Sequence, residues 1–141
     1  MDFDETVMKW RQSKSRSAVR RLDAFCSRRY EYKGKQFGHP STYALVRFEC
    51  APADSLVFEM QAEWPADLTT EYRRLLEAAM SAAIIDVLVA CENPHTGCHL
   101  RCVEVGWDEI CSSELAFYRA TKEAMIALRD EEKWSFVPRK E

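Results

Sequence analysis

Cysteine and histidine residues recur closely in the second half of the chain, in the order Cys91, His95, Cys98, His99 and Cys102. Thiolate and imidazole are ligands that zinc prefers, so the residue types suit a metal site. Cys98 and Cys102 lie four residues apart in a strand-like segment, which separates them by ~13 Å, too far to share one ion. Cys91 and His95 remain as a weaker pair that needs outside ligands. The alternative is a helix-to-strand turn that contains a histidine.

A nucleophilic thiol is the second possible chemistry. Cys111 precedes a predicted helix start, where the helix dipole favours a thiolate, and His39 is the histidine that the expected fold would bring near it. The alternative is a small residue tolerated before the helix. With six cysteines and no recognisable export signal, we expect reduced thiols, mostly in the core, and a cytoplasmic location. Ser81 and Asp86 interrupt the most apolar run, so no membrane span is expected.

Charge is distributed unevenly along the chain. Residues 1–36 carry ten Lys or Arg against five Asp or Glu, whereas residues 37–141 carry ten against eighteen. Apolar residues at three- and four-residue spacing predict a short helix from Ser17 to Arg29. Its other faces would carry the candidate anion-binding residues Arg20, Arg21, Arg28 and Arg29. They could meet RNA phosphates or an acidic protein surface; the alternative is a solvated basic helix that offsets an acidic body.

The remaining elements follow from hydrophobic periodicity. Strand patterns cover residues 29–33, 42–50, 56–64 and 98–103, with a further edge strand in the tail 133–137. Helical patterns cover residues 70–91, with Asp67 or Thr69 as the N-cap, and 112–129. The turn 51–54 contains a proline and predicts an antiparallel hairpin between two of the strands. This β-β-β-α-β-α order predicts an α/β (α+β) two-layer sandwich with a mostly antiparallel sheet and one greasy face beneath the helices.

The length of 141 residues and the 47% hydrophobic content suit one ordinary domain with a modest extension. We expect residues 1–29 to form a basic N-terminal helical extension. Residues 30–141 would then form the main domain.

Three local sequences resemble domain IV of translation elongation factor G. They are Tyr43-Ala44-Leu45-Val46 followed by Ala51-Pro52, the helical segment 72–83, and Ser112-Ser113-Glu114-Leu115-Ala116-Phe117. The resemblance covers roughly residues 30 to 130. It implies the fold of that domain, which includes an unusual left-handed crossover between strands. A serine hydroxyl and a nearby glutamate also make physical sense at a helix N-terminus, because both satisfy free N–H groups.

In the factor, this domain projects two tip loops into the decoding region of the ribosome. The matching loops here are 36–41 and 106–110, so the resemblance implies binding candidates at Phe37, Gly38, His39, Trp107 and Asp108. The first loop lacks the paired glycines and the arginine of the family pattern, and Asp108 stands where the family usually has histidine. The two aromatic residues could anchor a base or a protein partner; the alternative is that they pack inward beneath the loops.

No G-x-x-x-x-G-K-[ST] loop is present, and with four glycines in the chain we expect no GTP binding, no GTPase activity and no cofactor. We therefore expect a non-enzymatic binding module that engages RNA or a ribosome-linked partner. One alternative is a protein-interaction or regulatory domain without a translational role. A small thiol enzyme or zinc-dependent enzyme is the other.

Overall fold

The computed structural model describes residues 3, 5–7, 19–36, 39–91, 93–108 and 112–137. Residues 5–7 are helical. The strands are β1 (Val19–Leu22), β2 (Cys26–Gln36), β3 (His39–Pro52), β4 (Val57–Met60), β5 (Cys98–Gly106) and β6 (Trp134–Val137). The helices are α2 (Thr70–Ile84), which continues into the π-helical segment η1 (Ile85–Val89), and α3 (Glu114–Glu131).

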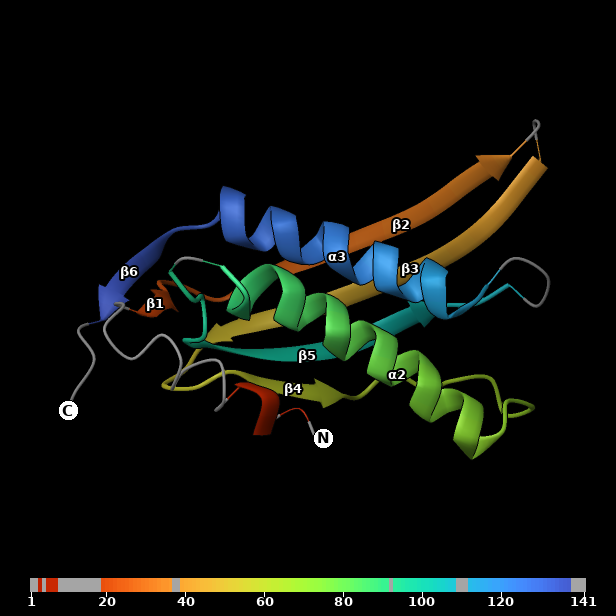
Figure 1. Cartoon of the computed structure of the whole chain (residues 1–141), viewed down its shortest axis with the longest axis horizontal. Helices are drawn as coiled ribbons and strands as arrows, with labels where there is room; N and C mark the ends of the chain where they lie inside the picture. Colours follow the sequence, from red (N-terminus) through yellow and green to blue (C-terminus); the bar gives the residue numbers. More distant parts are fainter. Residues whose placement is uncertain are drawn as a thin grey trace.

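A four-stranded sheet in the order β2-β3-β5-β4 forms one layer, and α2 and α3 cover one of its faces (Figure 1). β3 pairs antiparallel with both β2 and β5, whereas β4 pairs parallel with β5. β1 and β6 form a separate two-stranded antiparallel sheet. The two-layer sandwich with a mostly antiparallel sheet is therefore confirmed.

The parallel pair β4 and β5 is joined by a crossover through α2. In Figure 1 the chain runs to the right along β4 and returns to the left through α2, in front of the sheet. It then runs to the right again along β5, which lies between β4 and β3. This path is left-handed, as the sequence resemblance implied. Nearly all crossovers between parallel strands are right-handed, so the hand is a specific feature of the fold.

The core lies between the sheet and the two helices. Alternate residues of β3 and β5 are fully buried, and they meet the inner faces of α2 and α3, as the strand and helix periodicities predict. The largest fully buried side chains include Phe48, Leu100, Leu76, Met80, Ile84, Phe117 and Leu128. None of the helices in the described part of the chain is long and apolar enough to cross a bilayer.

The predicted helix from Ser17 to Arg29 is wrong, because the described residues from Val19 onward form β1 and the start of β2. Distant segments supply the backbone hydrogen bonds of β1: Leu22 N–H donates to the Gly97 carbonyl at 3.0 Å, and Gly97 N–H donates to the Arg20 carbonyl at 2.9 Å. The proposed boundary between residues 29 and 30 falls inside β2. Residues 26–29 therefore belong to the main sheet.

The close approach of β1 depends on Gly97. A Cβ atom added there would lie 2.5 Å from the Cα atom of Arg21, far inside van der Waals contact. Glycine is the residue that allows two backbones to come this close.

The predicted hairpin between strands 42–50 and 56–64 is also wrong. β3 and β4 are not neighbours, because β5 lies between them. Apolar and polar side chains alternate along both predicted strands. This alternation identifies which face of a strand is buried, but it does not identify the neighbouring strand. β4 also ends at Met60, and the Trp64 ring beyond it packs edge-to-face on Phe117 at a centroid distance of 5.1 Å.

Candidate functional site

The β2–β3 hairpin continues beyond the rest of the sheet. β2 and β3 remain paired as far as Gln36 and His39, whereas the pairing of β3 with β5 ends at Leu45 and Gly106. Five residues of two-stranded ribbon beyond that point correspond to about 17 Å. The ribbon extends past the N-terminal end of α3 (Figure 1). We call residues 32–43 the arm.

The composition of the arm differs from that of the rest of the chain. It contains Lys33, Lys35 and His39 but no Asp or Glu, which gives a formal charge of +2 with a neutral histidine. It also contains three aromatic residues, Tyr32, Phe37 and Tyr43. The side chains of Lys35 and His39, and Phe37 and Gly38 entirely, lie outside the described residues. The acid-free composition was visible in the sequence, but its meaning depends on knowing that these residues project together.

Two described contacts lie along the arm. The Lys33 Nζ atom pairs with the Glu31 carboxylate at 2.8 Å, and the lysine side chain is 61% exposed, so it remains accessible to another anion. Arg119 on α3 donates from Nη1 to the Tyr32 hydroxyl at 2.8 Å. Helix α3 therefore adds a cation to the side of the arm, and sequence reasoning missed it because residues 32 and 119 are far apart in the chain.

Trp107, in the second tip loop, packs inward. Its ring stacks on Phe117 at 6.1 Å and meets Tyr72 edge-to-face at 5.9 Å. The indole nitrogen is buried and has no hydrogen-bond partner within the described residues. These contacts make Trp107 part of the core margin and leave little of its ring for a partner. Asp108 is exposed at the surface.

The two serines before α3 have different roles. Ser113 is the N-cap, and its hydroxyl accepts a hydrogen bond from Ala116 N–H at 3.2 Å. The Ser112 hydroxyl instead donates to the Tyr43 carbonyl and accepts from Asp108 N–H, both at 2.8 Å. The sequence predicted that the helix begins at Ser112, but α3 begins at Glu114. Ser112 instead connects the second tip loop to the base of the arm.

Arg28 and Arg29 occupy successive positions of β2 and so point to opposite faces of the strand. Arg28 forms ion pairs with Glu131 at 3.5 Å and Glu132 at 2.5 Å, at the end of α3. The Arg29 guanidinium lies 3.7 Å from the Glu31 carboxylate. Carboxylates of the same chain therefore compensate Arg28, whereas the Arg29 side chain, which is 54% exposed, stays accessible as Lys33 does.

Arg20 and Arg21 lie on β1, at the opposite end of the molecule from the arm (Figure 1). The Arg20 guanidinium sits 3.9 Å from the centroid of the Phe136 ring, and Arg21 lies 3.8 Å from the Asp54 carboxylate. The structure therefore does not gather the four predicted arginines into one basic patch, nor does it place β1 beside the tip loops.

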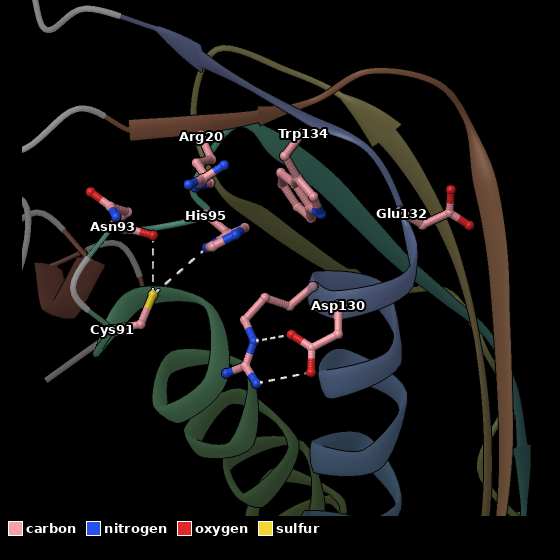
Figure 2. Close-up of a pocket in the computed structure, with 8 residues that line it drawn as sticks. Arg20, Cys91, Asn93, His95, Asp130, Glu132 and Trp134 are labelled. Atoms are coloured by element: carbon pink, nitrogen blue, oxygen red, sulfur yellow. Dashed lines mark hydrogen bonds and ion pairs between the residues drawn. The ribbon is translucent and has the colours of Figure 1, made fainter.

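The Cys91–His95 pair faces a cavity of about 600 Å³ near β1 and β6 (Figure 2). The Cys91 Sγ atom lies 3.7 Å from His95 Nδ1 and 3.2 Å from the Asn93 carbonyl oxygen. The His95 ring meets Trp134 edge-to-face at 4.9 Å. The cavity is lined by Arg20, Cys91, Asn93, His95, Arg129, Asp130, Glu132 and Trp134.

The environment of this pair does not favour nucleophilic chemistry. Burial, helped by the nearby Arg20 charge, lowers the pKa of His95 to about 4, so the imidazole is neutral at pH 7. Main-chain carbonyls of Leu88 and Asn93 accept from the Cys91 thiol, and these contacts suit an S–H donor. No group of three or more His, Cys, Asp or Glu side chains suited to a metal occurs among the described residues. Cys111, the other candidate thiol, lies outside them.

No family model matches the sequence, and a search of curated proteins finds no match. Among solved structures, the chain is similar to the crystal structure of ttk003000868 from Thermus thermophilus, with a TM-score of 0.65 and 21% identity. The match covers 84% of this chain and 18% of that chain. At this identity the similarity supports the fold alone. This chain therefore spans less than a fifth of the length of that Thermus thermophilus protein.

Proposed function

We propose that this protein is a non-enzymatic RNA-binding module that engages ribosomal RNA through its arm. The observation that carries the proposal is the projecting β2–β3 ribbon, which concentrates lysine, histidine and aromatic residues without a single carboxylate. The sequence resemblance to domain IV of elongation factor G also favours a binding surface at this end of the molecule, because that domain projects its tip into the decoding region.

Electrostatics favour an approach by the arm end. The chain has a formal charge of −3, and the arm contributes +2, so the remaining residues sum to −5. An RNA backbone is repelled by the acidic body and attracted by the arm, which orients the encounter. Of the arginines that the sequence suggested for this role, Arg28 pairs with two carboxylates and Arg20 lies over the Phe136 ring. Arg119 adds a cation beside Tyr32.

Phe37 and Tyr43 give the arm a second mode of recognition, whereas the Tyr32 ring packs partly against the core. Bases of unpaired nucleotides stack on aromatic rings, with a gain of about 1–3 kcal/mol per base. Sequence-specific recognition of RNA usually targets loops and bulges whose bases are accessible in this way. The proposed target is therefore a structured ribosomal RNA element with unpaired bases, rather than a continuous duplex.

A charge-reversal experiment tests the proposal. Affinity for purified ribosomal RNA is measured by filter binding at several salt concentrations, for the natural chain and for Lys33→Glu combined with Lys35→Glu. The double variant is expected to bind at least tenfold more weakly, with the slope of log K against log salt reduced by about 2. Lys133→Glu is the control, because this exposed lysine precedes β6 at the opposite end. Equal weakening by both variants would refute a role for the arm.

The second candidate is a protein-interaction domain. It is favoured by β6, where Phe136 is 55% exposed and Val137 is 38% exposed on a strand that pairs with β1 alone among the described strands. Such an edge can accept a strand from another protein. If Phe136→Ser abolishes capture of a partner while the arm variant has no effect on ribosomal RNA, this candidate replaces the first.

A further inference from the structure

Two cysteines face each other across the main hairpin, at the end away from the arm tip. Cys26 is the first residue of β2, and its register partner on β3 is Cys50. Cys50 is buried in the core, whereas Cys26 is partly exposed. Directly opposed residues of an antiparallel pair point to the same face of the sheet, so the register places both side chains on one face.

The register alone gives a geometry that a disulfide can span. Directly opposed residues of antiparallel strands have Cα atoms about 5.5 Å apart in a hydrogen-bonded pair and about 4.5 Å apart in the other kind. A disulfide requires a Cα separation of about 4.4–6.8 Å. Both kinds of pair fall within this range, so Cys26 and Cys50 can be bridged without moving either strand.

The other described cysteines do not meet the same condition. Cys98 is the register partner of Pro52, so it lies diagonally from Cys50, and diagonal neighbours are about 7–8 Å apart, beyond the disulfide limit of about 7 Å. Cys102 lies two residues beyond Leu100, the register partner of Cys50, so it is also a diagonal neighbour at about 7–8 Å. Cys91 lies outside the sheet, next to the Leu88 and Asn93 carbonyls.

We propose that Cys26 and Cys50 form a thiol–disulfide site that reacts with low-molecular-weight disulfides such as glutathione disulfide. The partly exposed Cys26, as its thiolate, attacks one sulfur of glutathione disulfide and displaces one glutathione thiolate. Cys50, as its thiolate, then attacks the Cys26 sulfur of this mixed disulfide and displaces the second glutathione. Two protein thiols are oxidised, one glutathione disulfide is reduced to two glutathiones, and the two protons end on the released thiols.

Cys26 is the entry point because it is the partly exposed thiol of the pair. The nearby Arg28 charge favours its thiolate. Burial and the Glu132 carboxylate oppose this effect and raise the pKa of Cys26, so the first step is slow near neutral pH. Once the mixed disulfide has formed, Cys50 is already positioned opposite, and the second step is intramolecular.

The bond would connect the two strands at the base of the hairpin. It closes a chain segment that contains the entire arm, and such a cross-link stabilises the folded state chiefly by restricting the unfolded chain. The site is separate from the arm tip, so the oxidised protein keeps the arm surface that the proposed function uses.

Peptide mapping tests the site directly. Trypsin places Cys26 in peptide 22–28 and Cys50 in peptide 48–73, whereas Cys91 and Cys98 share peptide 75–101. The folded natural chain is incubated with glutathione disulfide, alkylated and digested without reductant. The expected product is peptide 22–28 linked to peptide 48–73, with a higher melting temperature of the intact protein that dithiothreitol reverses.

Two other products would overturn the proposal. One is glutathione retained on Cys26 without linkage to Cys50, and the other is linkage of either peptide to 75–101. Cys26→Ser supplies a matched control at the partly exposed position, where it disturbs the core least. It should abolish the linked peptide and the rise in melting temperature, while Cys91→Ser should leave both unchanged.

Discussion

The hydroxyl of Ser112 provides a sharp test of how the second tip loop is attached. Ser112→Ala removes two hydrogen bonds of 2.8 Å, one to the Tyr43 carbonyl and one from Asp108 N–H. Each such bond contributes about 1 kcal/mol net, and a partly buried acceptor left without its donor adds to the loss. We therefore expect Ser112→Ala to lower the free energy of unfolding by about 2–3 kcal/mol.

The neighbouring serine is the matched comparison. Ser113→Ala removes one N-cap hydrogen bond to Ala116 N–H, which costs about 1 kcal/mol. Urea denaturation followed by circular dichroism measures both free energies, and the melting temperature should fall by about 5–10 °C for Ser112→Ala.

The order of the two effects is what the structure predicts. If Ser113→Ala destabilises more than Ser112→Ala, then Ser112 does not tie the loop to the arm. Equal effects of about 1 kcal/mol would leave Ser112 with the role of an ordinary cap residue.

Three further predictions concern other parts of the molecule. Gly97→Ala forces a Cβ atom against the Cα atom of Arg21 and should destabilise the protein by about 1–3 kcal/mol in urea denaturation, with β1 displaced; a neutral result would contradict the close approach. Burial lowers the folded-state pKa of His95 to about 4, so the unfolded chain binds the proton first and stability should fall as pH drops from about 6.5 to 4. His95→Gln should flatten that dependence in denaturation curves recorded across the window. Burial is the main cause that raises the pKa of Cys26, and the Glu132 carboxylate is the second. Glu132→Gln removes this second cause, so iodoacetamide should alkylate Cys26 faster at pH 8 than in the natural chain.

Periodicity was sufficient for the elements that lie on the core. The clean alternation of residues 42–50 corresponds to part of β3, and the helical spacing of residues 70–91 corresponds to α2 and η1. The predicted N-cap Thr69 is confirmed, because its hydroxyl accepts from Tyr72 N–H at 3.1 Å. These signals are local and match the side-chain period of each element.

Pairing between distant segments was not available from the sequence. Residues 19–29 fit a helical period, but backbone partners at Gly97 and in β6 make them strands. Likewise, β3 and β4 have no local feature that reveals β5 between them. Tertiary contacts override local preference in both cases.

The predicted site residues divide in the same way. The sequence left Trp107 open between an exposed anchor and inward packing, and its contacts with Tyr72 and Phe117 show inward packing. The cations at Arg28 and Arg29 were visible in the sequence, but their carboxylate partners come from other positions. The sequence shows that residues 32–43 contain no Asp or Glu. That these residues project beyond the sheet follows only from the strand register.

Cross-linking to bound RNA identifies the surface of the protein that contacts the RNA. The natural chain is bound to ribosomal RNA, irradiated with ultraviolet light, and digested with nuclease and trypsin before mass spectrometry. We expect nucleotide adducts to concentrate in peptide 36–47, which contains the outer arm with Phe37 and Tyr43. Adducts confined to peptide 75–101 or to residues 134–137, with peptide 36–47 unmodified, would contradict it.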